Sequence, residues 1–392
     1  MSSSHILSRE KGRIVLKNGG QCVFTYVIKS HNNENPTFIL YDSMKTNGLK
    51  VEMTDKKVEV SILNPYRVLV DISNDIVHDV PYWFSLDAQN RRIYAGVGEP
   101  RIETAKYWYN FKEDSYKKVL ECLSNIEHND RIECRKVLKD PVTRAISLLV
   151  KDIDELSMDD IAMGWYMPKA NLSMVSQKMY DCISGKKFVL NTDDFPDFSN
   201  AIEYSIKTSG CWCNTTLKNK SREFNKDKPN IKETYLRITL GENNGESPGV
   251  PYVMEIWPVG HYSPVHSHAG ADAVIRVLHG SINVKLFPYL SEKMPIPFGV
   301  ANFNEGDITW ISPTLNQIHK LENFRTNKDT CITIQCYMYN EKDRLHYDYF
   351  DYIDGNGEIQ PYEPDSDMDY IAFKEKMRTE WTNAKNVINN FI

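Results

Sequence analysis

Two histidines stand two positions apart in the stretch GHYSPVHSHAG, at His266 and His268. On a β-strand, residues i and i+2 project to the same side, so both imidazoles would face one point. His319, in the segment NQIHKLEN between two strand-like runs, offers a third ring nitrogen. Three neutral imidazoles hold a divalent first-row metal and leave coordination positions open for substrates. The pattern predicts a three-histidine metal site, and the alternative for the pair taken alone is a histidine-rich bend in a surface loop.

Glycines and one asparagine frame these histidines. Gly260 precedes the pair, Gly280 ends the β-rich run AVIRVLHG, Gly306 opens GDITWISP, and Asn323 lies shortly after His319. In this order, the glycines, histidines, proline and asparagine resemble the two sequence motifs of the cupins. The resemblance implies a small double-stranded β-barrel that brings the three histidines together.

The segment after the histidine pair departs from the usual cupin pattern. Cupins commonly carry a glutamate ligand a few residues after the second histidine, and here that position is Ala273. Asp272 lies one residue earlier, so on a regular strand its side chain should face away from the site. We therefore expect a three-histidine site without a carboxylate, and Asp272 remains the alternative as a fourth ligand.

The segments WPVGHYSPVHSHAG and VLHGSINVKLF, followed by IHKLEN, resemble the cysteine dioxygenase family of thiol dioxygenases. The resemblance covers roughly residues 230–340 and extends more weakly over about residues 115–230. It implies that the cofactor is Fe(II) and that its ligands are His266, His268 and His319. The N-terminal part of the chain lies outside the resemblance.

Further positions match the substrate-binding residues of this family. The run TYLRI places Tyr235 and Arg237 on one face of a strand before the metal motif. The resemblance implies that Arg237 holds the substrate carboxylate, with which a guanidinium can form two parallel hydrogen bonds. A late strand of the family carries a serine, a histidine and a tyrosine at alternate positions beside the iron. The matching run TIQCY gives Thr333, Gln335 and Tyr337, which alternate onto one strand face.

Two positions differ from the family. In its animal members, a cysteine crosslinked to the tyrosine occupies the position of Ala273, so Tyr337 cannot form that crosslink here. Gln335 replaces a histidine, and its amide can hydrogen-bond the Tyr337 phenol but cannot titrate. Without the resemblance, Arg237 would be interpreted as a surface arginine on a strand. These differences bear on the substrate and the rate more than on metal binding.

The elements that must position these residues divide the chain into four parts. Residues 1–112 contain predicted strands, such as QCVFTYVIK and KVEVSIL, at a spacing typical of a β-sandwich. Residues 113–228 are mostly helical, residues 229–350 return to strands that form the barrel, and residues 351–392 are a tail with a polar helix. The predicted fold class is mainly β: a C-terminal cupin double-stranded β-barrel preceded by a helical segment, plus a separate N-terminal β-sandwich-like domain.

Apolar spacing and capping residues predict helices in the middle part. Their sequences are SYKKVLECLSNIEH, DPVTRAISLLVKDIDEL, ANLSMVSQKMYDCISG and DFPDFSNAIEYSIKTSG. The third is expected to begin at an Asn171 N-cap and to end at Gly185. The run TTLKNKSREFNKDKPN that follows is expected to be a polar connector.

Composition and charge narrow the class of partner. The net charge is −6 and lysines and arginines form no large block, which disfavours nucleic-acid binding. The eight cysteines are scattered, and the close pair in CWC has the spacing of neither a zinc knuckle nor a redox motif, so free thiols in a reducing compartment are expected. Apolar runs are too short for a membrane span, and the first residues lack the apolar core of a secretory signal. We expect a soluble cytoplasmic protein without a nucleic-acid or membrane partner.

The leading hypothesis is an Fe(II)-dependent thiol dioxygenase, an oxidoreductase that converts cysteine or a similar small thiol carboxylate to its sulfinate with O₂. In this hypothesis Tyr337, Gln335 and Thr333 act at the reacting centre, and Arg237 and Tyr235 bind the substrate. One alternative is a cupin metalloenzyme acting on a non-thiol substrate such as a sugar or a phenolic. The other is a metal-binding cupin sensor or scaffold. In this last alternative, the N-terminal domain is a binding module for an unknown ligand or protein.

Overall fold

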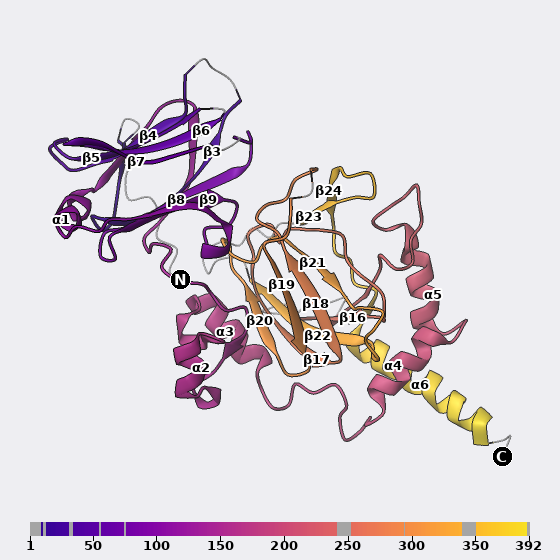
Figure 1. Cartoon of the computed structure of the whole chain (residues 1–392). Helices are drawn as coiled ribbons and strands as arrows, with labels where there is room; N and C mark the ends of the chain where they lie inside the picture. The colour runs from indigo at the N-terminus through magenta and orange to yellow at the C-terminus, as the bar shows by residue number, and fades with distance from the viewer. Residues whose placement is uncertain are drawn as a thin grey trace. The chain divides into compact units, whose positions relative to one another are not determined.

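The computed structural model of the chain consists of two compact units, Met1–Ile146 and Ser147–Ile392 (Figure 1). Strands dominate both units, so the predicted mainly β class is confirmed. The structure describes residues 9–10, 13–30, 34–54, 56–73, 76–240, 252–293, 295–338 and 350–389.

The N-terminal unit is a sandwich of two antiparallel sheets. One sheet has the strand order β1-β2-β11-β4-β5-β6-β7, and the other has the order β10-β9-β8-β3-β12. Between them the rings of Phe24, Phe38 and Phe84 pack edge-on at centroid distances of 5.1 Å and 5.4 Å. The elements are β1 (Arg9–Glu10), β2 (Arg13–Val15), β3 (Gln21–Ile28), β4 (Thr37–Tyr41), β5 (Gly48–Thr54), β6 (Lys57–Leu63), β7 (Tyr66–Ser73), β8 (Pro81–Asp87), β9 (Arg92–Val97), β10 (Ala105–Asn110), α1 (Ser115–Cys122), β11 (Asn125–His128) and β12 (Ile132–Leu138).

This sandwich extends well beyond residue 112. β11 pairs with β2 and β4, and β12 pairs with β3, so both sheets include strands from the segment predicted as helical. The first predicted helix is limited to α1, and Ile126, whose spacing fitted the helix, is buried in β11. No α-helix forms over DPVTRAISLLVKDIDEL, because Val142 packs against Trp83 and its amide donates to Ser85 Oγ at 2.9 Å. Packing onto the sheet outweighs local helix propensity there.

The C-terminal unit contains the predicted double-stranded β-barrel. One sheet has the order β20-β17-β22-β16-β15-β25, and the smaller sheet β19-β18-β21 lies over it (Figure 1). Side chains from both sheets, including Trp257, Val277, Ile282 and Phe303, form the core between them. The strands are β13 (Val150–Lys151), β14 (Met167–Pro168), β15 (Leu236–Leu240), β16 (Tyr252–Trp257), β17 (Asp272–His279), β18 (Ser281–Leu286), β19 (Gly299–Asn304), β20 (Ile308–Ile311), β21 (His319–Glu322), β22 (Cys331–Met338), β23 (Phe350–Ile353), β24 (Ile359–Tyr362) and β25 (Met368–Asp369).

Helices pack on the outside of this barrel. α3 lies against β22, where Cys336 Sγ is 3.5 Å from the Met179 carbonyl oxygen. Ser173, rather than the predicted Asn171, is the N-cap of α3, because its hydroxyl accepts a hydrogen bond from the Ser176 amide. The helices are α2 (Met158–Met163), α3 (Met174–Ile183), α4 (Phe198–Lys207), α5 (Trp212–Asn219) and α6 (Tyr370–Asn389). Within the described ranges, none of the helices is both long and apolar enough to span a membrane.

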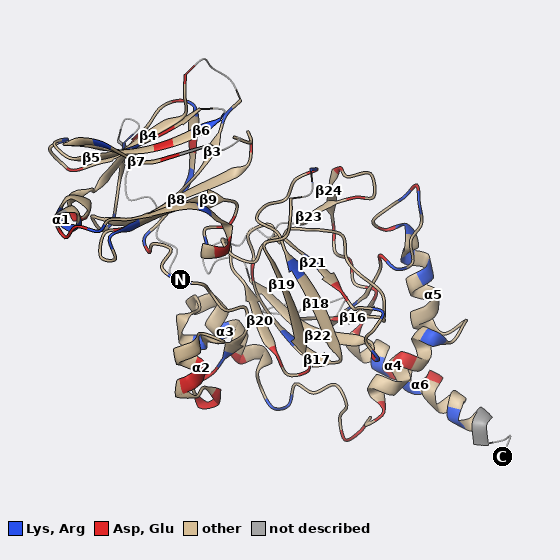
Figure 2. Ribbon diagram, viewed as in Figure 1, with Lys and Arg blue, Asp and Glu red and all other residues tan. Residues whose placement is uncertain are grey.

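The chain after residue 350 is an integral part of the barrel unit. β25 pairs in parallel with β15, and α6 packs on α4. Acidic and basic side chains are mixed over α4, α5 and α6 (Figure 2), and Lys374 of α6 pairs at 2.9 Å with Asp194, which precedes α4. The predicted polar connector is wrong in its first half, because α5 forms there and buries Leu217.

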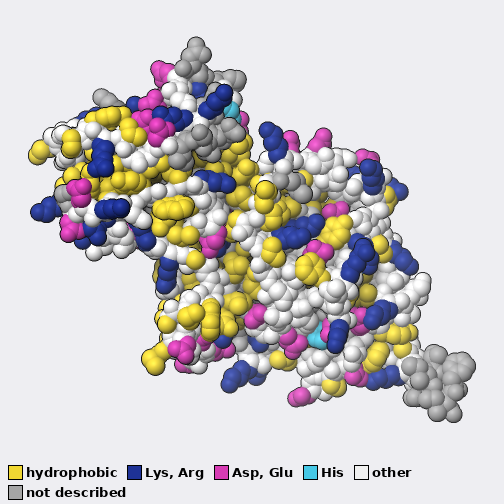
Figure 3. Space-filling model, in the orientation of Figure 1, with side chains coloured by type: hydrophobic (Ala, Val, Ile, Leu, Met, Phe, Trp, Pro, Cys, Tyr) yellow, Lys and Arg dark blue, Asp and Glu magenta, His cyan; other side chains and the backbone are white. Residues whose placement is uncertain are grey.

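Hydrophobic side chains gather at the surface around α2, at the lower left of Figure 3. Met158 is 89% exposed and Trp165 is 56% exposed. A capping box between Ser157 and Asp160 opens the helix, and Gly164, with a φ of 67°, ends it. Because α2 buries none of its residues, its ends stabilise it rather than an apolar face.

The motif glycine Gly280 occupies a backbone position that only glycine fits. Its φ is +71°, and a Cβ there would lie 2.7 Å from the Thr330 carbonyl oxygen. We expect Gly280→Ala to destabilise the protein by about 2–4 kcal/mol, from left-handed strain together with this clash. Gly306 has a φ of +91°, but a Cβ there would meet no atom within 4 Å. Gly306→Ala therefore measures the cost of the left-handed backbone without a clash. Urea unfolding compares the two, and equal losses of stability would contradict the clash.

Candidate metal centre

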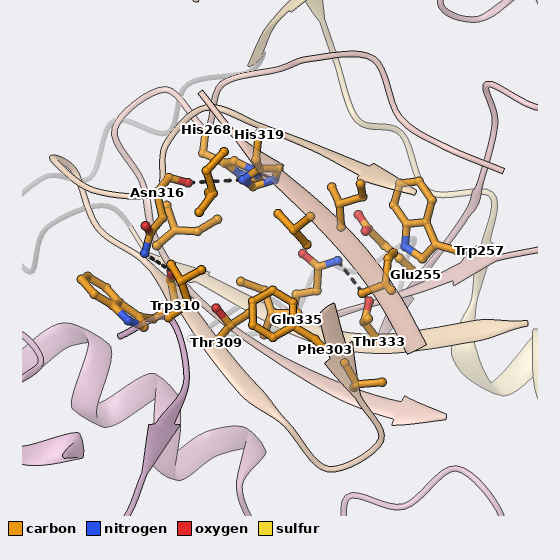
Figure 4. A pocket seen from close by; sticks show the side chains of 18 of the residues that line it. Glu255, Trp257, His268, Phe303, Thr309, Trp310, Asn316, His319, Thr333 and Gln335 are labelled. Atoms are coloured by element: carbon orange, nitrogen blue, oxygen red, sulfur yellow. Dashed lines mark hydrogen bonds between the residues drawn. The ribbon is translucent and has the colours of Figure 1, made fainter. Parts of the chain in front are cut away.

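The three predicted histidines converge at one end of the barrel. His266 and His319 lie on neighbouring segments, and each backbone amide donates to the other carbonyl, at 3.0 Å and 3.1 Å. His268 joins them, with its Nε2 atom 3.1 Å from Nε2 of His319 (Figure 4). One ring nitrogen from each residue lies within 4.8 Å of the others. The strand pairing therefore brings together imidazoles that are separated by about 50 residues in the sequence.

Backbone carbonyls orient two of the rings. Nδ1 of His266 lies 3.1 Å from the Pro264 carbonyl oxygen, and Nδ1 of His319 lies 3.3 Å from the Asn316 carbonyl oxygen. A carbonyl oxygen only accepts, so each Nδ1 carries the hydrogen. The Nε2 lone pairs are then free to bind a metal, as in metal-binding histidines whose second nitrogen donates to a fixed acceptor.

Burial keeps all three histidines neutral near pH 7. It lowers the pKa of His266 to about 4 and that of His319 to about 3, in the latter case with a further contribution from the His266 charge. Burial also lowers the pKa of His268 far below its usual value, and the neighbouring histidines add to the effect. Neutral imidazole is the form that coordinates a metal ion, so the donors are ready for one without losing protons.

His268 has an unsatisfied ring nitrogen. Its Nε2 faces the unprotonated Nε2 of His319, and its Nδ1 is buried without a hydrogen-bond partner. A hydrogen on Nε2 satisfies that contact but leaves the buried Nδ1 lone pair unpaired. A hydrogen on Nδ1 instead makes two lone pairs face each other. A cation between the rings removes the repulsion, so this donor set fits a divalent first-row metal.

The positions of these residues within the barrel follow the two sequence motifs. His266 and His268 precede β17, and His319 opens β21. Asn323, after the third histidine, is fully buried and donates to the Trp257 carbonyl oxygen at 2.8 Å. The C-terminal barrel has the cupin fold.

Solved structures match parts of the chain at low identity. No family model matches the chain. The chain is similar over 28% of its length to a cupin superfamily protein from Desulfitobacterium hafniense, with 13% identity, 81% of that chain covered and a TM-score of 0.21. It is also similar to the polyketide cyclase RemF from Streptomyces resistomycificus (16% identity, 27% of this chain, 65% of that chain, TM-score 0.22) and to a putative sugar phosphate isomerase from Acidithiobacillus ferrooxidans (16%, 34%, 79%, 0.22). A fold hosts many chemistries, so the function has to be argued from the site.

The structure removes Asp272 from the set of candidate ligands. Its Oδ1 accepts hydrogen bonds from Ser176 Oγ at 3.0 Å and Ser173 Oγ at 3.3 Å, on the side of α3. Ala273, the next residue, is fully buried and pairs across the strands with Tyr337. The position that carries a glutamate in the usual cupin pattern thus faces the site, and in this chain its side chain is only a methyl group.

Polar side chains on β22 run from the histidines into the barrel. Tyr337 donates its phenol hydrogen to Gln335 Oε1. Gln335 Nε2 in turn donates to Thr333 Oγ1 at 3.3 Å (Figure 4). The Tyr337 ring stacks on His268 with a centroid distance of 5.8 Å. The predicted alternation along TIQCY therefore holds, and burial raises the pKa of Tyr337 well above its usual value, which keeps the phenol protonated.

Arg237 and Tyr235 also face the interior, so Arg237 is not a surface arginine. Tyr235 stacks on Trp257 at a centroid distance of 4.3 Å, and Arg237 is 9% exposed. Arg237 pairs directly across the strands with Glu255, and the next strand places Thr333 beside that glutamate. One row of side chains thus crosses β15, β16 and β22.

Glu255 is a site residue that sequence reasoning missed. Its Oε1 lies 3.4 Å from a terminal guanidinium nitrogen of Arg237, and the two side chains are 7% and 10% exposed. Burial raises the pKa of Glu255, and the Arg237 charge opposes that shift. A signal was present in YVMEIWPV, because strand alternation puts Glu255 on the same face as Val253 and Trp257, in an otherwise apolar run.

Two cavities meet at the histidines. The larger, of about 70 Å³, holds on the order of five water-sized groups and lies inside the barrel (Figure 4). Trp257 and Trp310 are buried and line it. The smaller cavity includes Arg237 and Phe350. Both cavities share Tyr235, Glu255, His266, His268 and Tyr337.

His261 lies outside the histidine cluster. Its Nδ1 donates to the Thr234 carbonyl oxygen at 2.9 Å, and burial lowers its pKa to about 4. The unfolded chain takes up a proton near pH 6.5, whereas the folded protein resists it, so stability falls as the pH drops below 6.5.

We expect this histidine to make the protein sensitive to mild acid. Between pH 7 and pH 5, the wild type should lose about 2 kcal/mol more stability than His261→Gln, as measured by urea unfolding. His279→Gln, at a partly exposed histidine beside Glu305, is the control and should behave like the wild type. If the free energy of unfolding changed with pH in the same way for wild type and His261→Gln, the buried His261 would not be the source of the acid sensitivity.

Proposed function

We propose that this cupin is an Fe(II)-dependent thiol dioxygenase that oxidises a small thiol carboxylate, either cysteine or a relative such as 3-mercaptopropionate. The observation that carries the proposal is the set of three neutral histidines without a carboxylate ligand, next to the Tyr337 phenol and the Arg237 guanidinium. Three protein ligands leave positions open for a substrate and for O₂.

The proposed reaction is R–SH + O₂ → R–SO₂H. The O–O bond breaks, two S–O bonds form, and the sulfur loses four electrons, which both oxygen atoms take up. Fe(II), when bound, would supply the redox chemistry that joins dioxygen to the thiolate sulfur.

The residues of the chain would bind and orient the substrate. Arg237 would pair with its carboxylate, and Tyr337 would donate a hydrogen bond to the reacting sulfur or oxygen. In the structure Gln335 Oε1 accepts the single hydrogen of the phenol, and substrate binding would redirect that hydrogen to the reacting atom. Thr333 accepts a hydrogen bond from Gln335, and Tyr235 forms part of the wall. Apolar side chains such as Val277 and Phe303 line most of the larger cavity and exclude bulk water.

The test is oxygen uptake by anaerobically iron-loaded protein after addition of a thiol and air, with mass spectrometry of the product. We expect about one iron per chain and a sulfinate whose amount matches the O₂ consumed. Absence of both oxygen uptake and sulfinate across a panel of small thiols would overturn the proposal.

Tyr337→Phe keeps the ring but removes the hydroxyl group. Because the Tyr337 ring stacks on His268 and its hydroxyl is a protonated donor, we expect kcat to fall by about 10-fold to 100-fold while the iron content stays unchanged. Tyr262→Phe is the matched control. Tyr262 lines neither cavity, and its hydroxyl accepts a hydrogen bond from Asn230. An unchanged kcat in Tyr337→Phe would remove this residue from the reaction.

A cupin oxygenase or isomerase acting on a sugar or a phenolic is the second candidate. The aromatic walls at Trp257, Trp310 and Phe303 favour it, since they suit a ring-shaped ligand. Arg237→Ala distinguishes the two candidate functions. It should impair oxidation of a thiol carboxylate but not turnover of a neutral, ring-shaped substrate.

A further inference from the structure

A buried carboxylate and a buried guanidinium lie side by side at the meeting point of the two cavities. Arg237 and Glu255 approach each other through one contact of 3.4 Å, rather than through two short parallel hydrogen bonds. The guanidinium Nε of Arg237 is buried without a hydrogen-bond partner. The internal pair is thus loose, and Arg237 has donor capacity left for a ligand.

The charges that line the cavities differ. Among the described residues around the larger cavity, Glu255 is the single Asp, Glu, Lys or Arg. Around the smaller cavity, Arg237 and Glu255 contribute one charge of each sign. A ligand with a carboxylate alone would bring a second negative charge next to Glu255 in a buried site, which is costly. A ligand with one positive and one negative group would keep the site neutral.

We propose that Glu255 is a specificity-determining residue that binds the ammonium group of a zwitterionic thiol, while Arg237 binds its carboxylate. On binding, the two residues exchange their loose mutual contact for one ligand group each, so no charge is left buried and unpaired. The thiol is then directed to the histidines, since His266, His268 and Glu255 line both cavities. This inference rests on the proposed function and selects, within its substrates, an α-amino thiol over a plain mercaptocarboxylate.

Binding to protein loaded with Co(II) under anaerobic conditions tests the inference separately from turnover. The probes are cysteine, 3-mercaptopropionate and cysteamine, which carry both charged groups, only the carboxylate and only the amine. Thiolate binding is followed through the sulfur-to-cobalt charge-transfer absorption. We expect cysteine to bind at least about 10-fold more tightly than either of the other two.

Glu255→Gln should reverse this preference, because the freed Arg237 then accepts a carboxylate without a competing negative charge. 3-Mercaptopropionate should bind this variant more tightly than the wild type, and cysteine should bind it more weakly. Glu233→Gln is the matched control, because Glu233 is partly buried but lines neither cavity, and it should leave all three affinities unchanged.

The outcomes separate this inference from the proposed function. If 3-mercaptopropionate binds the wild type as tightly as cysteine and is oxidised, the thiol dioxygenase stands and the role of Glu255 is refuted. If no thiol binds the loaded protein and no oxygen is consumed, both are refuted. The wild-type comparison decides even if Glu255→Gln fails to fold.

Discussion

His319→Ala is expected to abolish metal binding and, with it, activity. The variant leaves two histidines, and it also removes the ring whose Nδ1 the Asn316 carbonyl orients. We expect the metal content to fall from about one ion per chain to near zero and kcat/KM to fall by more than about 100-fold. Elemental analysis and oxygen uptake measure the two effects on the same preparation.

His261→Gln is the matched control for this loss. It replaces another buried histidine of the same barrel, one whose ring donates to the Thr234 carbonyl and lies outside the cluster. This variant should keep its metal and its activity at neutral pH. Full metal content in His319→Ala would mean that the three imidazoles are not the ligand set.

The second large effect is expected from separating the buried ion pair. Arg237→Met leaves the Glu255 carboxylate in a site where it is 6% exposed and without its cation. We expect a loss of about 3–5 kcal/mol in the free energy of unfolding at pH 7. The double variant Arg237→Met/Glu255→Leu should recover most of this loss, because it leaves no unpaired charge.

The pH dependence of this loss gives an independent check. Burial already raises the pKa of Glu255, and removal of Arg237 should raise it further. The folded variant then keeps a proton that the unfolded chain releases, so its stability falls as the pH rises above the usual glutamate range. Urea unfolding at pH 5 and pH 7 should therefore show a smaller penalty at pH 5. An equal penalty at both would contradict an ionised buried Glu255.

The metal ligands and the barrel could be predicted because their signals are local. The spacing of His266 and His268 fixes their common direction on an extended chain, and the glycines mark the tight turns between short strands. Gly280 is an example: its backbone is left-handed and lies so close to the Thr330 carbonyl that a larger residue would not fit. The third ligand, His319, could be named as a candidate from its place between two strand-like runs, but its pairing with His266 is a long-range contact that local spacing does not show.

The features that were missed depend on contacts between distant segments. Ile126 has helical spacing in the sequence, but it belongs to β11, because this segment forms backbone hydrogen bonds with β2 and β4. Arg237 is buried, and its charged partner Glu255 lies on the neighbouring strand. The sequence leaves Asp272 as a possible fourth ligand, whereas in the structure its carboxylate accepts hydrogen bonds from Ser173 and Ser176. In each case tertiary context decided what local spacing left open.

The measurement that bears most directly on the central claim is incorporation of isotopically heavy dioxygen into the product. Iron-loaded protein is supplied with cysteine and labelled O₂, and the sulfinate is examined by mass spectrometry. The proposed reaction places both atoms of one O₂ molecule on the same sulfur, so we expect a doubly labelled sulfinate in an amount equal to the oxygen consumed. A sulfinate with one label or none, or oxygen uptake without sulfinate, would contradict a thiol dioxygenase at the three-histidine site.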